Sequence, residues 1–392
     1  MTITNPRITG LHALIAMALL VLSLCSTLAW SAPMIPAPPT LSAKSWLLLD
    51  AKTGHIITEY NADQRLPPAS LTKMMTTYIA SEQLTSGNIH YEDMVRVSEK
   101  AWRKGGSKMY IREGTEVKLE DLMRGIIIQS GNDASIALAE HIAGSEDAFA
   151  DLMNQTAHSL GMSNSHFQNA TGWPADDHYT TARDLSLLAR AIINDHPEDY
   201  AIYSEKEFTF NNIRQPNRNT LLWQDDAVDG IKTGHTEEAG YCLVASARKD
   251  DMRLISVVMG TRSEKDRAAE SQKLITYGFR FYETINQYQA NQELLEPEVW
   301  KGRNNAVKLG TEEAIWLTIP RGTAADIVPE LEVPELIMAP IVKGEKVGTI
   351  RLSLNGETIA TKPLVALENV EEGGIFKRVW HWLLLLIKGL FS

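Results

Sequence analysis

The chain has 392 residues, of which 44% are hydrophobic and 22% are charged, a composition typical of a folded globular protein with room for two domains. Its net charge of −11 at pH 7 excludes nucleic acid as a partner of the body of the chain. The same composition excludes disordered, collagen-like and polytopic membrane classes.

Residues 1–31 predict a secretory signal peptide. Arg7 gives a positive start, residues 11–24 form an apolar run without a charge, and the small residues Ala29 and Ser31 fit a cleavage site. An uncleaved anchor is the alternative, although the apolar run is short for a bilayer span. We therefore expect a mature chain that begins near residue 32 in an exported compartment.

The cysteine count predicts a mature chain without disulfides. Cys25 would be removed with the signal peptide, which leaves Cys242 alone. A single cysteine between apolar neighbours is typical of a small core residue. We found no metal-ligand spacing, Walker loop or dinucleotide fingerprint, so no cofactor and no metal are expected.

The body of the chain, residues 32–286, predicts one α/β unit. A hairpin is expected from residues 46–50 and 55–60 around a short turn. Helical periodicity is present in residues 71–84, 119–128, 134–142, 148–160 and 182–193. Strand-like runs follow at residues 207–210, 240–247 and 253–259, and a helix is expected at residues 263–282. Strands at both ends with helices between them predict an antiparallel sheet covered by helices.

Residues 287–371 predict a small all-β module. Short apolar stretches at residues 314–319, 336–341 and 347–352 alternate with Gly, Pro and Asn turns. The module has no cluster of His, Cys and acids, so we expect a spacer without chemistry.

Residues 372–392 predict an amphipathic membrane anchor. At helical spacing Lys377, His381 and Lys388 share one face near Arg378, and apolar and aromatic residues cover much of the remainder. Such a helix is expected to lie in the membrane interface. A helix docked on its own domain is the alternative, and two consecutive glycines before the segment favour a detachable tail.

The first chemical motif is Ser70-Leu-Thr-Lys73. Pro67 and Pro68 precede it, and the pattern predicts a helix that begins near Ser70. Residues three apart share a helix face, so the lysine amine can reach the serine hydroxyl. Lysine serves as a base only where burial or another cation lowers its pKa.

The second motif is Ser130-Gly-Asn132, at the start of a helix. A serine hydroxyl there can relay a proton to a leaving amine, and the asparagine amide can hold a substrate carbonyl. The same tripeptide occurs at residues 86–88, where we expect only a turn. The setting, not the tripeptide, carries the prediction.

The third motif is Lys232-Thr-Gly234, next to a predicted strand. A lysine pointing into a cleft would orient a carboxylate and lower the pKa of Lys73, and Gly234 would let substrate approach the backbone. A second copy at residues 52–54 is expected to be the hairpin turn.

In this order and spacing, the three motifs resemble the signature set of penicillin-recognising serine enzymes. Residues 41–371 are similar to the low-molecular-mass D-alanyl-D-alanine carboxypeptidases of the penicillin-binding protein five and six type. The similarity is carried by LPPASLTKMMT, LMRGIIIQSGNDA, TARDL, EFTFNNIRQPNRN, VDGIKTGHTEEAGY and RLISVVMG. It implies a serine β-lactamase/transpeptidase-like domain with an antiparallel sheet and helices, a small all-β C-terminal domain and a terminal amphipathic helix.

The resemblance also implies roles for single residues. Thr233 and Arg218 match positions that bind the terminal carboxylate, and the backbone amides of Ser70 and His235 would form the oxyanion hole. The implied catalytic residues are Ser70, Lys73 and Ser130. The implied substrate-binding residues are Asn132, Arg218, Lys232, Thr233, Gly234 and His235.

The implied reaction is removal of the terminal D-alanine from peptidoglycan stem peptides through an acyl-enzyme, with β-lactams as covalent inhibitors. The implied location is the periplasmic face of the bacterial inner membrane, with the tail helix on lipid. A serine β-lactamase, a D,D-endopeptidase and a non-catalytic cell-wall scaffold are the alternatives. Glu207 and Asn211 have a spacing that a β-lactamase deacylation base uses, but they lie too late in the chain. An extra proline before Ser70 and a short segment at residues 102–110 depart from the family pattern.

Overall fold

The computed structural model describes residues 35–391. The predicted signal peptide lies outside these described residues. The proline-rich lead-in is described from residue 35 and forms no helix or strand before β1.

A five-stranded antiparallel sheet forms the centre of the α/β unit, in the order β2-β1-β9-β8-β7. The strands are β1 Ser45–Asp50, β2 Ile56–Tyr60, β7 Val228–Thr236, β8 Gly240–Lys249 and β9 Met252–Thr261. The chain thus returns from residue 228 to pair β9 with β1, which confirms the predicted antiparallel sheet with helices between its strands. Residues 52–54 form the turn of the β1–β2 hairpin, as predicted.

Helices surround this sheet, and those predicted from periodicity are confirmed to within about two residues at each end. The longer helices are α2 Thr72–Thr85, α4 Leu119–Ile127, α5 Asn132–Ala143, α6 Glu146–Ser159, α7 Ala182–Asp195 and α10 Glu264–Phe281. The shorter ones are η1 Ala69–Leu71, α3 Glu99–Arg103, α8 Pro197–Tyr200, η2 Ala201–Ser204 and α9 Leu221–Gln224.

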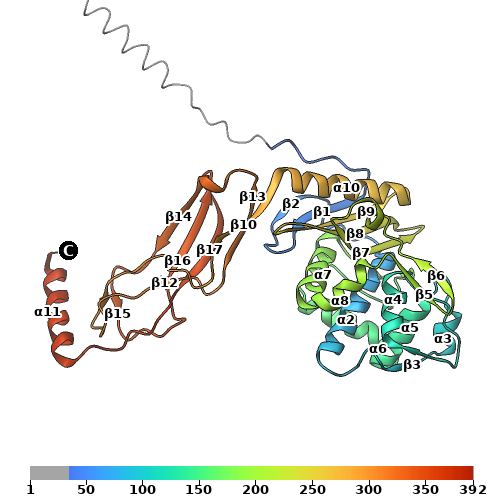
Figure 1. The fold of residues 1–392 in the computed structure, drawn as a ribbon, viewed down its shortest axis with the longest axis horizontal. Helices are drawn as coiled ribbons and strands as arrows, with labels where there is room; N and C mark the ends of the chain where they lie inside the picture. Colours follow the sequence, from blue (N-terminus) through green and yellow to red (C-terminus); the bar gives the residue numbers. More distant parts are fainter. Residues whose placement is uncertain (1–34, 392) are drawn as a thin grey trace, which may run out of the picture. The chain divides into compact units, whose positions relative to one another are not determined.

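Helices cover both faces of the sheet, and alternate side chains of each strand point to opposite faces. Leu47 and Leu49 join the large core that contains α2, α4, α5 and α7. Leu48 lies on the other face, where Gly278 lets α10 come close to the sheet: a Cβ at Gly278 would lie 3.1 Å from the Leu48 side chain. Figure 1 shows α10 on one face of the sheet and the helices of the large core on the other.

Two short antiparallel strand pairs complete the α/β unit. One pairs β3 Met94–Arg96 with β4 Glu116–Lys118, and the other pairs β5 Glu207–Phe210 with β6 Ile213–Pro216. The first was not predicted, because each of its three-residue strands buries a single side chain between two exposed ones. Such strands have too little alternation to be distinguished from a loop.

The predicted all-β module is confirmed. A four-stranded sheet has the order β12-β17-β16-β14, and two-stranded pairs join β10 to β13 and β11 to β15. The elements are β10 Tyr282–Tyr288, β11 Val299–Trp300, β12 Leu309–Gly310, β13 Ile315–Pro320, η3 Ala324–Asp326, β14 Ile327–Glu332, β15 Ile337–Met338, β16 Lys346–Leu354 and β17 Glu357–Ala366. Two separate apolar clusters fill the module.

The terminal helix is present as α11 Ile375–Phe391. Its polar side chains contact the module: Lys377 Nζ donates to the Arg303 carbonyl at 3.0 Å, and His381 Nδ1 accepts from the Lys301 amide at 2.9 Å. Most of its apolar side chains from residue 375 to residue 387 are exposed, with Phe376 94% exposed. No helix within the described part of the chain is both long enough and apolar enough to cross a membrane.

Candidate active site

Ser70 and Lys73 lie where the chain enters the first long helix. Ser70 is the middle residue of η1, and Lys73 is in the first turn of α2, so the predicted helix start is correct to within two residues. Lys73 Nζ lies 3.1 Å from Ser70 Oγ. The three-residue spacing therefore brings the amine to the hydroxyl, as a helical turn requires.

Lys73 is fully buried and makes two further contacts. Its Nζ donates to Asn132 Oδ1 at 2.7 Å and to the Thr171 carbonyl at 2.6 Å. A neutral amine has two N–H bonds and one lone pair. With both N–H bonds directed at fixed acceptors, the lone pair is left to face Ser70 Oγ, which is the arrangement a general base needs.

Burial lowers the pKa of Lys73 to about 7, and the nearby charges of Arg218 and Lys104 act in the same direction. Asp133 opposes them. A substantial fraction of Lys73 is therefore neutral at pH 7, which suits proton abstraction from Ser70.

Ser130 lies across the cleft in the link between α4 and α5. It is 3% exposed and adopts a left-handed backbone with φ of 65°, a conformation that is uncommon for a non-glycine residue. Its Oγ has no hydrogen-bond partner among the described residues. A buried hydroxyl without a partner is available for a substrate atom.

The same link is tied to the loop at residues 104–111. Asn132 Nδ2 donates to the Gly105 carbonyl at 2.8 Å, and Asp133 carboxylate oxygens accept from the amides of Met109 and Tyr110 at 2.9 Å. Asn132 thus joins Lys73 to this loop and keeps one further N–H for a ligand. By contrast, the second Ser-Gly-Asn, at residues 86–88, is a turn after α2.

The Lys-Thr-Gly motif lies within β7, at the edge of the sheet that faces η1. Lys232 is 2% exposed, and burial, followed by repulsion from Lys73, holds the pKa of Lys232 well below its usual value. A Cβ at Gly234 would lie 3.1 Å from the Pro68 carbonyl oxygen and 3.2 Å from Leu71 Cγ. Gly234 therefore lets β7 pack against the turn that carries the nucleophile, in addition to the predicted approach of substrate.

Two arginines stand at one end of the cleft. Arg218 is exposed, and its Nε donates to the Gln129 carbonyl at 3.1 Å, which leaves its terminal nitrogens for a ligand. Arg267, on α10, is 5% exposed, forms an ion pair with Glu264 and lines the same cavity. Arg267 was not singled out from the sequence, because nothing in its helical segment distinguishes it from a surface arginine.

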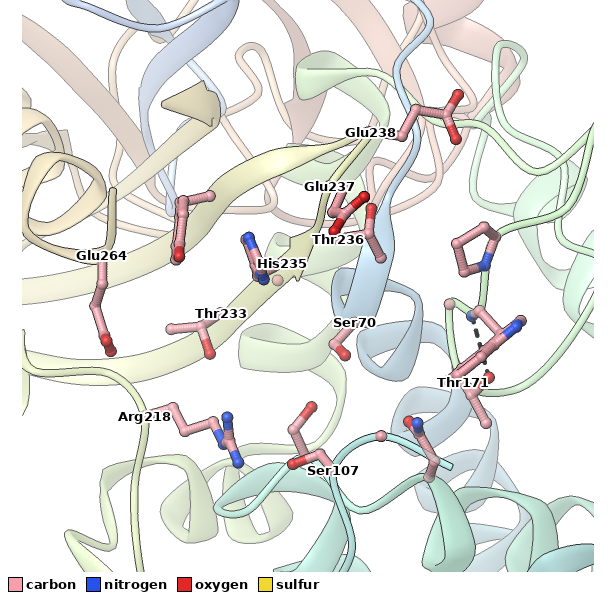
Figure 2. A pocket seen from close by; sticks show the side chains of 18 of the residues that line it. Ser70, Ser107, Thr171, Arg218, Thr233, His235, Thr236, Glu237, Glu238 and Glu264 are labelled. Atoms are coloured by element: carbon pink, nitrogen blue, oxygen red, sulfur yellow. Dashed lines mark hydrogen bonds between the residues drawn. The ribbon is translucent and has the colours of Figure 1, made fainter. Parts of the chain in front are cut away.

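The cavity that these residues line has a volume of about 850 Å³. Ser70, Thr233 and Arg218 face it together, and His235 lines it from near the end of β7 (Figure 2). The His235 ring stacks on Tyr241 with centroids 3.9 Å apart. The sequence-predicted residues that line the cavity are Ser70, Ser130, Asn132, Arg218, Thr233, Gly234 and His235.

The loop between α6 and α7 forms the opposite wall and was not predicted to take part. Thr171, Gly172 and Trp173 line the cavity, and Trp173 is 44% exposed. Residues 171–173 carry no charged side chain, and their contribution to Lys73 is a backbone carbonyl, which no side-chain motif can indicate.

The family model for D-alanyl-D-alanine carboxypeptidase, Peptidase_S11, matches residues 32–263, more than half of the chain. The chain belongs to the D-alanyl-D-alanine carboxypeptidase family. The model for the C-terminal domain of penicillin-binding protein 5 matches residues 282–372.

Relatives in this family match over nearly the whole chain. D-alanyl-D-alanine carboxypeptidase DacC of Escherichia coli strain K12 is 47% identical over 365 residues, which cover 91% of each chain. DacA of Haemophilus influenzae is 45% identical over 361 residues, which cover 91% of this chain and 92% of that protein. The crystal structure of penicillin-binding protein 5 from Haemophilus influenzae superposes with a TM-score of 0.82 at 44% identity, covering 86% of this chain and 100% of that one.

A more distant structure adds a ligand state. Penicillin-binding protein D2 from Listeria monocytogenes, in its ampicillin-bound form, superposes with a TM-score of 0.57 at 30% identity, covering 62% of this chain and 100% of that one. Membership of the D-alanyl-D-alanine carboxypeptidase family thus agrees with the resemblance seen in the sequence and with the transpeptidase-like fold.

Proposed function

We propose that this chain is a serine D-alanyl-D-alanine carboxypeptidase that removes the terminal D-alanine from peptidoglycan stem peptides. The observation that carries the proposal is the environment of Lys73, a buried amine with a lowered pKa whose two N–H bonds are occupied and whose lone pair faces Ser70. The names of the relatives supply the substrate class.

Substrate binding uses the charge at one end of the cleft. The carboxylate of the terminal D-alanine lies against Arg218 and the Thr233 hydroxyl, since a guanidinium binds a carboxylate through two parallel hydrogen bonds. Arg267 adds positive charge to the same cavity. This places the scissile bond beside Ser70.

In the acylation step Lys73 takes the proton of Ser70, and Ser70 Oγ attacks the carbonyl carbon of the penultimate D-alanine. The backbone amides of Ser70 and His235 stabilise the negative charge on the carbonyl oxygen. The C–N bond then breaks, and the proton passes through Ser130 to the leaving amine of D-alanine. Asn132 accepts a hydrogen bond from Lys73 and binds the substrate amide, so it keeps the base and the substrate in position.

Hydrolysis of the ester on Ser70 completes the cycle. Water adds to the ester carbonyl carbon and gives a proton to Lys73. The ester C–O bond then breaks, and Lys73 returns the proton to Ser70 Oγ. A β-lactam carries a comparable acyl group and carboxylate, so we propose that it acylates Ser70 by the same first step. The ampicillin-bound relative supports this proposal.

A β-lactamase needs a base that hydrolyses the acyl-enzyme rapidly. Glu207, considered for that role from its spacing, is on β5 and pairs with Arg214, and it does not line the cavity. The carboxylates that do line the cavity belong to Glu237, Glu238 and Glu264. A long-lived penicillin adduct would separate a carboxypeptidase from a β-lactamase.

We propose that α11 places the enzyme on the periplasmic face of the inner membrane. Its polar residues face the module through Lys377 and His381, while large apolar side chains are exposed between residues 375 and 387. An exposed apolar helix face with basic residues beside it is expected to insert into a lipid interface. We also propose that the domains begin at residues 32, 287 and 372, and that residues 1–31 are a signal peptide.

The proposed activity is tested by measuring D-alanine release from a stem pentapeptide. The full chain should release D-alanine, and Ser70→Ala should not. Ser86→Ala, in the second Ser-Gly-Asn, is the matched control and should keep wild-type release. Equal release by Ser70→Ala and the wild type would refute a serine mechanism.

A further inference from the structure

His178 is a buried histidine that the mechanism above does not use. It lies in the loop between α6 and α7 and is 5% exposed. Its Nε2 lies 3.0 Å from Thr72 Oγ1, and its Nδ1 lies 3.3 Å from Asn169 Nδ2. Thr72 directly precedes Lys73, so the imidazole connects the start of α2 to the loop.

Asn169 organises the part of the loop that reaches Lys73. Its Oδ1 accepts from the backbone amides of Thr171, Gly172 and Trp173 at 3.1, 2.9 and 3.1 Å. Three N–H donors on this atom identify it as the oxygen of the amide, so the nitrogen faces His178. The turn that presents the Thr171 carbonyl is therefore built around the Asn169 side chain.

These contacts assign the tautomer of His178. Asn169 Nδ2 can only donate, so His178 Nδ1 accepts and the ring proton is on Nε2. Nε2–H then donates to Thr72 Oγ1. The ring links loop and helix only in this neutral form, because a protonated ring would place two donors against each other at Asn169.

The neutral form is the one expected at pH 7. Burial, together with the charge of His166, lowers the pKa of His178 to about 4. The other titratable groups around the ring line a polar hollow that His178 shares, and they are Arg65, Asp176, Tyr179 and Glu238. At neutral pH both hydrogen bonds of His178 are therefore intact.

The loop is held to one face of α2 at three successive places. His178 bonds Thr72, the Thr171 carbonyl accepts from Lys73, and the carbonyl of Ala170 accepts from Thr76 Oγ1 at 2.7 Å. The middle contact is the one that matters for chemistry, because it occupies an N–H bond of the base. Its geometry depends on the contacts at either side.

We propose that His178 is a positioning residue for acylation: through Thr72 and Asn169 it holds the Thr171 carbonyl against Lys73. The inference rests on the proposed function of Ser70 and Lys73 and goes beyond it by assigning a role to a residue that touches neither substrate nor nucleophile.

Loss of this support should have a specific kinetic signature. If the Thr171 carbonyl moves away, the Lys73 lone pair is no longer aimed at Ser70 and water reaches the amine. Less burial raises the pKa of Lys73, so the rise of the acylation rate with pH, called the pH limb below, moves to higher pH. The charged groups that face Lys73, namely Lys104, Asp133, Arg218 and Lys232, are unchanged by the substitution.

The test uses the full chain and a fluorescent penicillin, with the acylation rate measured against penicillin concentration and pH. For His178→Ala we expect the saturating acylation rate at pH 7 to fall by at least about tenfold, since small misplacements of a catalytic group have large effects. The half-saturating penicillin concentration should change little, because Arg218 and Thr233 remain in place. The pH limb should move upward.

Two milder variants keep the test decisive if His178→Ala folds poorly. His178→Gln can present an N–H to Thr72 and should recover part of the rate. Thr72→Val keeps the ring and removes its acceptor, and it should reproduce part of the loss and the same direction of pH shift.

His196 provides a matched control at the other end of the same helix. It is 6% exposed, its Nε2 lies 2.6 Å from Glu82 Oε1, and its Nδ1 lies 3.1 Å from Thr85 Oγ1. His196→Ala removes a comparable buried tie to α2 and should lower the melting temperature without moving the pH limb. A pH limb that is unchanged in His178→Ala and Thr72→Val, or shifted equally in His196→Ala, would overturn the proposal. A wild-type chain that penicillin does not acylate would instead refute the proposed function.

Discussion

A methyl group added to Gly172 would lie 1.7 Å from the carbonyl oxygen of Ala69. Gly172 is in the loop that contacts Lys73, and Ala69 is the residue before Ser70, so the loop and the turn that carries the nucleophile are in direct backbone contact. Gly172 also has φ of +80°, a region in which side chains are strained. Two independent constraints therefore require glycine at this position.

Gly172→Ala should reduce penicillin acylation of Ser70 strongly, because the loop or η1 must move apart to admit a Cβ. Gly144→Ala is the control: Gly144 has φ of +79° and ends α5, and its added Cβ would meet no atom within 4 Å. Each substitution should lower the free energy of unfolding by about 1 kcal/mol or more from backbone strain alone. Equal acylation rates for the two variants would contradict a role for this contact.

The acylation rate should rise with pH through about 7, because burial lowers the pKa of Lys73 and only its neutral amine can accept the Ser70 proton. Arg218→Gln removes a nearby cation, so the pKa of Lys73 should increase and the limb should move to higher pH. The half-saturating substrate concentration should rise as well, since the carboxylate loses its guanidinium. The measurement is the pH profile of penicillin acylation.

Arg214→Gln is the matched control for Arg218. Arg214 lies on the adjacent β6 strand, is exposed and pairs with Glu207. It should leave both the pH limb and the half-saturating concentration unchanged. A limb that stays in place in Arg218→Gln would show that Arg218 does not act on Lys73.

The two Lys-Thr-Gly copies allow a direct comparison. Lys232→Ala should lower D-alanine release by at least about tenfold, because a preorganised hydrogen-bond donor is lost from behind the cleft. Lys52→Ala removes a lysine whose Nζ lies 3.1 Å from the Trp316 ring centroid, outside the cleft, and should retain wild-type release. Steady-state release from a stem pentapeptide measures both. Similar losses in the two variants would mean that the effect of Lys232 is on folding rather than on the site.

Membrane attachment should depend on the exposed apolar face of α11. Phe376 is 94% exposed and Leu383 is 43% exposed, so the double substitution Phe376→Asp and Leu383→Asp should abolish sedimentation with anionic lipid vesicles. Deletion of residues 374–392 should do the same and leave release from soluble peptide intact. Val328→Asp, on β14 and 58% exposed, is the control and should sediment as the wild type does. Retention of the double variant on vesicles would refute an interfacial anchor.

The sequence alone determined the features that depend on residues close together in the chain. The Ser70–Lys73 spacing fixes an amine near a hydroxyl because any helical turn does so. The periodicity of residues 182–193 and the turn at residues 52–54 predicted α7 and the first hairpin for the same local reason. The short β3 and β4 strands were missed because their pairing, and not their own pattern, makes them strands.

The tertiary structure alone decided which copies of a motif work and how the base is prepared. The identical tripeptides at residues 52–54 and 232–234 have different settings: the first is the turn of the β1–β2 hairpin, and the second lies within β7 and faces η1. The carbonyl of Thr171 reaches Lys73 across 98 positions of sequence. Burial of Lys73, and with it the lowered pKa, arises only when the sheet, the helices and the loop close around one amine, because desolvation is a property of the packed core and not of any segment.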